Sequence, residues 1–140
     1  MGQAKLLRDV DFMETRRNSR KVLRDYSRLD RIAGRSSIDV RSPLITGMPK
    51  VYSNGNRSED AIIQQIDAEK ERDAILNALL ALKLTSRQIL HCSFCVPDRY
   101  SNTRLSQELG YSIRQIERLK AEALIEFAES YKAGKLIEWK

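Results

Sequence analysis

Forked polar side chains gather at the start of one amphipathic stretch. Residues 112–124 read SIRQIERLKAEAL, and Arg114, Gln115 and Arg118 fall in its first two turns. Arginine can bond guanine, and glutamine can bond adenine, through pairs of hydrogen bonds to base edges in the major groove. These residue types at this spacing therefore predict direct reading of double-stranded DNA.

The residues before this stretch have the pattern of a helix-turn-helix. A short helix over 103–109 has a leucine face, Gly110 can adopt the positive φ of a tight turn, and Ser112 can cap the second helix by accepting the N–H of its second or third residue. Tyr111 is expected to pack as a staple at the corner. Such corners also join helices in proteins that never touch DNA, so that alternative stays open.

The last helix is predicted to run from Ser112 to about Tyr131. Its apolar residues recur at spacings of three and four, which is typical of a helix with one face in the core. That core stripe comprises Ile116, Leu119, Ala123, Phe127 and Tyr131. The free face would then show Ile113, Arg114, Gln115, Glu117, Arg118 and Lys120.

The chain as a whole is predicted to be all-α. Helical spacing also marks residues 9–34 and 58–83, and a further helix capped by Thr85 or Ser86 is expected to end near Cys95. No strand pattern competes. We expect a basic N-terminal helical segment (1–35), a loop-rich linker (36–57) and a helical domain (58–140) whose helix-turn-helix covers about 85–131. The apolar tail Leu136, Ile137 and Trp139 either folds back onto the domain or docks a protein.

Positive charge is concentrated at the front of the chain. The net charge is +6, and residues 1–57 hold 13 Lys or Arg against 6 Asp or Glu. A dense basic helix suits a polyanion, because each neutralised phosphate releases counterions. A solvated face, or a patch that meets RNA polymerase or another acidic protein, is the alternative. The basic-helix residues are Arg16, Arg17, Arg20, Lys21, Arg24, Arg28, Arg31 and Arg35.

Several other functions are disfavoured. Cys92, Cys95 and His91 are too few to complete a structural zinc site, so no metal is expected and Cys92 is interpreted as a small core residue. No catalytic motif is present, so we expect no enzyme, no cofactor and no small-molecule substrate. The acidic run 67–73 is interpreted as a solvated helix. With no signal peptide and no apolar run long enough to cross a membrane, the protein is expected to be soluble and intracellular.

The segment from Leu84 to Leu124 resembles region 4 of bacterial sigma factors. The motifs that carry the resemblance are SRQILHCSF, LSQELG and SIRQIERLKAEAL. It implies base-reading positions at Ile113, Arg114, Gln115, Glu117 and Arg118, and DNA-backbone positions at Tyr100, Asn102, Thr103, Arg104, Ser112 and Lys120. Region 4 domains commonly carry basic residues where this chain has Ile113 and Glu117. The DNA sequence read should therefore differ from an ordinary −35 element.

The chain from about 20 to 131 resembles ArpU-type phage transcriptional regulators more closely still. YSRLDRIAGRS and LITGMPKVYSNGNRSEDAIIQQIDAE precede the region 4-like end. The resemblance implies an activator of late phage genes, for packaging or lysis, that acts with host RNA polymerase. The alternatives are a phage packaging protein of the terminase small-subunit type and a protein adaptor without DNA contact. Whether the protein forms a homodimer is left open by the sequence.

Overall fold

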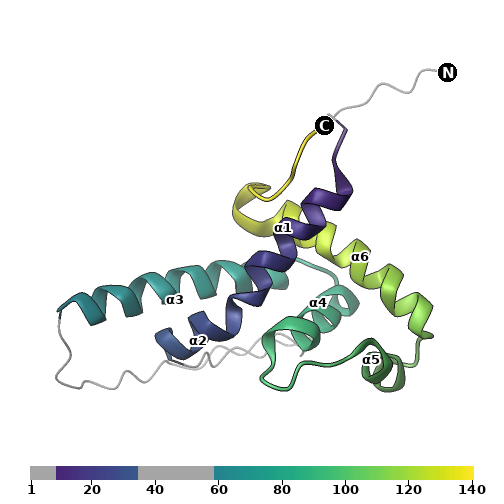
Figure 1. Cartoon of the computed structure of the whole chain (residues 1–140), viewed down its shortest axis with the longest axis horizontal. Coiled ribbons are helices and arrows are strands. Elements are labelled where there is room, and N and C mark those ends of the chain that lie inside the picture. Colours follow the sequence, from purple (N-terminus) through teal and green to yellow (C-terminus); the bar gives the residue numbers. More distant parts are fainter. Residues whose placement is uncertain (1–8, 35–58) are drawn as a thin grey trace.

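Helices make up most of the described part of the chain, in the order drawn in Figure 1. The computed structural model describes residues 9–34 and 59–140. Within these ranges there is no strand beyond a single bridge, so the predicted all-α class is confirmed for them. The elements are α1 (Phe12–Arg24), α2 (Tyr26–Ala33), α3 (Glu59–Leu80), α4 (Leu84–Leu90), the π-helical turn η1 (His91–Cys95), α5 (Asn102–Leu109), α6 (Ile113–Ser130) and the 3-10 turn η2 (Tyr131–Ala133).

The front of the chain forms two helices, so the single helix predicted over 9–34 is wrong. Asp11 caps α1 by accepting the Glu14 N–H at 3.2 Å, and Asp25 separates α1 from α2. At the break, the Asp25 N–H reaches back three residues to the Val22 carbonyl at 3.1 Å. The change of direction lets α1 pack on α6 while α2 packs along α3.

The helix that begins at Leu84 also differs from its prediction. Neither Thr85 nor Ser86 caps it, because Lys83 stands at the cap position and gives no side-chain hydrogen bond. Ser86 is instead buried and donates to a carboxylate oxygen of Glu126 at 3.2 Å, which ties α4 to α6. The chain then widens into the π-helical turn η1, where the Val96 N–H bonds the His91 carbonyl five residues earlier at 3.3 Å.

One apolar cluster joins both ends of the sequence. Side chains from α1, α2, α3 and α6 meet in it, each at most about one-twentieth exposed, and burial of such a side chain contributes about 1.5–3 kcal/mol. Its members include Leu23, Tyr26, Ile75, Leu76, Leu79, Leu124 and Phe127. The predicted linker, residues 36–57, lies outside the described residues, as does Arg35.

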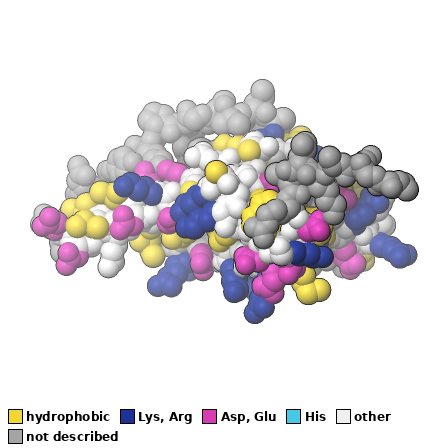
Figure 2. All heavy atoms as spheres, turned by 90° about the horizontal axis from the view of Figure 1, so that it is seen from above, with side chains coloured by type: hydrophobic (Ala, Val, Ile, Leu, Met, Phe, Trp, Pro, Cys, Tyr) yellow, Lys and Arg dark blue, Asp and Glu magenta, His cyan; other side chains and the backbone are white. Residues whose placement is uncertain are grey.

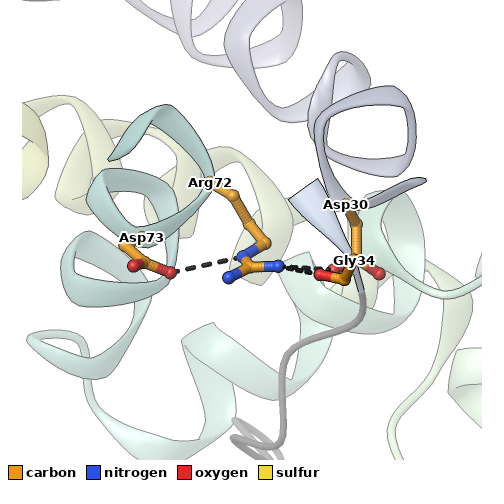
Figure 3. A network of polar contacts seen from close by, with 4 residues as sticks. All are labelled: Asp30, Gly34, Arg72 and Asp73. Carbon is orange, nitrogen blue, oxygen red and sulfur yellow. Dashed lines mark hydrogen bonds and ion pairs between the residues drawn. The ribbon is translucent and has the colours of Figure 1, made fainter. Parts of the chain in front are cut away.

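A buried arginine ties α2 to α3 (Figure 3). Arg72 is 1% exposed, so the prediction that the run 67–73 is solvated is wrong at this position. Its guanidinium lies 3.2 Å from an Asp73 oxygen and 3.5 Å from an Asp30 oxygen, and it also donates to the Gly34 carbonyl. Gly34 ends α2 at φ 84° and ψ 146°, a conformation that other residues rarely adopt.

The tail returns to the start of the chain, which resolves the two sequence alternatives in favour of folding back. Val10 and Trp139 form an antiparallel bridge, and Leu136 packs against the core. The Thr15 hydroxyl accepts the Glu138 N–H at 3.0 Å, and the Asn18 amide donates to the Leu136 carbonyl at 3.1 Å. The tail therefore holds α1 in place.

Truncation after Lys135 is expected to destabilise the protein by about 1–3 kcal/mol, because Leu136 leaves the core and buried Thr15 loses its donor. Urea unfolding followed by circular dichroism measures the change. Trp139→Ala is the control, since this ring is 37% exposed and its backbone contacts remain. An unchanged midpoint after truncation would show that the tail does not stabilise α1.

Within the described ranges, no helix combines the length and the hydropathy that crossing a bilayer requires.

Candidate nucleic-acid interface

The corner between α5 and α6 is built by local capping. Ser101 accepts the Arg104 N–H at 3.1 Å and starts α5. Gly110 ends α5 in the left-handed conformation, at φ 80° and ψ 17°, and its N–H bonds the Ser106 carbonyl at 3.0 Å. The predicted role of Gly110 is confirmed, because a side chain at this φ would be strained.

Ser112 starts α6 with a reciprocal capping box. Its hydroxyl accepts the Gln115 N–H at 3.1 Å, and the Gln115 side-chain oxygen accepts the Ser112 N–H at 2.9 Å. The predicted cap is therefore confirmed. The box also engages the amide oxygen that Gln115 would need for paired bonds to adenine, so reading that base would require Gln115 to leave the cap.

Tyr111 contributes less to the corner than the sequence suggested. The residue Tyr111 is 36% exposed, whereas its backbone carbonyl accepts a hydrogen bond from the Ser106 hydroxyl. Backbone hydrogen bonding, together with burial of Leu105 and Ile116, fixes the angle between the helices.

The first turns of α6 present the polar face that the sequence predicts. All five residues proposed to read bases are exposed: Ile113, Arg114, Gln115, Glu117 and Arg118. The opposite face is fixed, because Ile116 packs with Ile89, Cys92 and Leu105 in a second buried cluster. The expectation that Cys92 is a core residue is thus confirmed. The described chain contains no group of three or more His, Cys, Asp or Glu side chains placed to hold a metal.

The residues assigned to the DNA backbone lie around the start of α5. The Arg104 guanidinium lies 3.7 Å above the centre of the Tyr100 ring. The Lys120 ammonium donates to the Asn102 side-chain oxygen at 2.5 Å and so links α6 to α5. Burial, and then the charge of Arg20 on α1, lower the pKa of Lys120. Thr103 and Ser112 are also exposed.

Comparison with known proteins places the chain in a family. It is 63% identical over 135 residues to a protein of Enterococcus hirae named autolysin regulatory protein ArpU, covering 96% of this chain and 98% of that one. The chain belongs to the ArpU family. A Streptococcus phage O1205 protein with the same name is 28% identical, over 94% of this chain and 97% of the relative.

A third relative also comes from a phage. Protein Gp66 of Listeria phage A118 is 30% identical over 135 residues, 86% of each chain. No family model matches the chain, and no solved structure gives a significant match. The names of the relatives point to a regulatory family that occurs in phages.

Arg99 is a basic residue of this ArpU-family chain that sequence reasoning missed. It is exposed in the loop before α5, and its guanidinium donates to the Arg24 carbonyl at the end of α1, at 3.4 Å. The sequence offered one signal for it, since Arg99 directly precedes Tyr100, which the resemblance assigns to the DNA backbone. The contact could not be foreseen, because it joins residues 75 positions apart.

Ser112→Ala is expected to cost about 1 kcal/mol of stability, because α6 loses the acceptor for its Gln115 N–H. Thermal unfolding measures this loss. Ser130→Ala is the matched control at the other end of α6, where the hydroxyl only donates back to the Glu126 carbonyl. Equal effects of the two substitutions would contradict a special role for the cap.

Proposed function

We propose that this ArpU-family chain is a sequence-specific DNA-binding activator of transcription that serves late phage genes, for packaging or lysis, with bacterial RNA polymerase. The observation that carries the proposal is the exposed polar face on the first two turns of a capped α6. A helix that enters a major groove reads bases with residues at its N-terminal end. The protein would act in the bacterial cytoplasm, where that DNA lies.

The chemistry of this face suits mixed recognition. Arg114 and Arg118 can each pair with the two acceptors of a guanine, and Glu117 can accept from a cytosine amine. Ile113, which is 45% exposed, can contact a thymine methyl group. An apolar and an acidic residue on the same face as two arginines favour sequence reading over general attraction to phosphate.

The regulatory part of the proposal draws on two sources. Two of the relatives are named as regulators of autolysin, and two of the three come from phages. The resemblance of residues 84–124 to sigma region 4 supports a role beside polymerase. Both sources are similarities to other proteins, so the test must include RNA polymerase itself.

The test starts with selection of bound duplexes from random DNA by the wild-type protein, followed by footprinting on a phage genome that carries the selected sequence. Protection of a late promoter, extended when bacterial RNA polymerase is added, is the expected result. Protection at a packaging site alone would replace the proposal with a terminase-type role. No protection of any site would indicate an adaptor that does not bind DNA.

A further inference from the structure

The basic helix α1 lies directly against the recognition helix. The Ser19 hydroxyl donates to the Leu124 carbonyl at 2.8 Å, and both residues are fully buried. Arg20 follows Ser19 in α1, and Lys120 lies one turn before Leu124 in α6. The buried bond therefore brings Arg20 close to Lys120, just beyond the residues proposed to read bases.

A second contact joins the end of α1 to the start of α5. Arg99 donates to the Arg24 carbonyl, and the next residue, Tyr100, lies beneath the Arg104 guanidinium. These links place the C-terminal half of α1 beside the residues assigned to the DNA backbone. The sequence alone had treated the basic helix as a separate segment.

Three arginines each follow one of the buried residues Thr15, Ser19 and Leu23 of α1. Arg16, Arg20 and Arg24 recur every fourth residue and so lie along one face of the helix. Asn18 projects elsewhere and holds the tail through the Leu136 carbonyl. Within the described part of the chain, no carboxylate lies within ion-pair distance of the three arginines.

Electrostatics agree with this geometry. Burial lowers the pKa of Arg20, and the charges of Arg16 and Arg24 lower it further. Burial and the charge of Arg20 also lower the pKa of Lys120, whereas the charge of Glu117 raises it. Like charges held this close repel one another, so an anion that bound between them would relieve the repulsion. Figure 2 shows Lys and Arg side chains scattered over one face of the molecule and interspersed with acidic ones.

We propose that Arg16, Arg20 and Arg24, together with Lys120 and Arg99, form a phosphate-binding band that contacts the DNA backbone beside the groove entered by α6. The inference rests on the proposed function and extends it, because it assigns the basic helix to DNA rather than to polymerase. In helix-turn-helix complexes, an element next to the recognition helix commonly crosses the backbone. Here α1 takes that position from the far end of the sequence.

The same helix offers a matched control. Arg17 and Lys21 carry the same number of charges and are exposed. They lie farther around α1 from Ser19, the residue that bonds α6, than the three band arginines do. Arg17 also lies 3.6 Å from a carboxylate oxygen of Glu14. Arg20→Gln with Arg24→Gln therefore removes two charges from the band, whereas Arg17→Gln with Lys21→Gln removes two from outside it. The Arg24 contact with Arg99 uses the backbone carbonyl, so it survives substitution.

The experiment measures affinity for a duplex selected by the wild-type protein, and for an unrelated duplex of equal length, over a series of KCl concentrations. Each phosphate contact contributes about 0.9 to the slope of log K against log salt. We expect the band variant to reduce the magnitude of this negative slope by about 1.8 on both duplexes. We expect the control variant to leave the slope nearly unchanged. Thermal unfolding confirms that both variants are folded.

Each other outcome overturns the inference in a distinguishable way. Equal loss from both double variants would mean diffuse attraction without a band. An unchanged slope for the band variant, with binding still abolished by loss of Arg114 and Arg118, would reject the band and leave the proposed function standing. Unchanged DNA binding with weaker binding to purified bacterial RNA polymerase would assign the surface to protein. No binding by the wild-type protein would reject the proposed function itself.

Discussion

Arg72→Met is expected to destabilise the protein by about 3 kcal/mol. The guanidinium is almost fully buried, and its loss removes its contacts with the Gly34 carbonyl and with the Asp30 and Asp73 carboxylates. Removal of one partner from a buried charged group commonly costs about 3–5 kcal/mol. Asp30 and Asp73 remain 23% and 37% exposed, so water compensates in part and the lower end applies.

Differential scanning calorimetry would record this change as a fall in Tm of about 10 °C, given the size of the chain. Asp73→Asn is the matched control, because it weakens one exposed branch of the network in Figure 3 and leaves the other contacts of Arg72. We expect that substitution to cost less than about 1 kcal/mol. A stable Arg72→Met protein would show that packing of α2 on α3 does not depend on the arginine.

The second large effect concerns DNA. Arg114→Ala with Arg118→Ala is expected to weaken binding to the selected duplex about 100-fold or more, because each lost guanine contact costs about 1–3 kcal/mol. Preference at two base pairs should relax, while affinity for an unrelated duplex falls much less. Binding measured by fluorescence anisotropy, on both duplexes at one salt concentration, tests both statements.

Glu122→Ala is the control for this variant, since Glu122 is exposed on the same helix one turn beyond Arg118. We expect it to leave sequence preference unchanged. If the double arginine variant weakened binding to both duplexes equally, Arg114 and Arg118 would contact phosphate rather than bases. Both arginines are exposed, so a folded variant is expected.

The sequence predicted best where structure is decided locally. Ser112, Gly110 and the apolar spacing of residues 116–131 each act within a few positions, and the structure matches them. That spacing also predicted which residues of α6 are exposed, except that Lys120 is half-buried and bonds Asn102. The candidate site on α5 and α6 could therefore be predicted from local sequence features, without any long-range contact.

Other features depended on distant partners. Nothing in residues 22–29 marks the break at Asp25, because apolar spacing continues through it and the two halves bend to reach different helices. Arg72 lies in a charged run that is typical of solvated helices, and only Gly34 and Asp30 explain its burial. The place of Arg20 beside Lys120 likewise follows from a bond between Ser19 and Leu124.

That same bond sets an order of events during synthesis. Ser19 and Leu124 are 105 residues apart, so α1 leaves the ribosome long before its partner exists. At a synthesis rate of about 5–20 residues per second, α6 is made about 5–20 s after the basic helix α1. The helix α1 is therefore made early, but it can form its buried bond with α6 only after translation has passed Leu124.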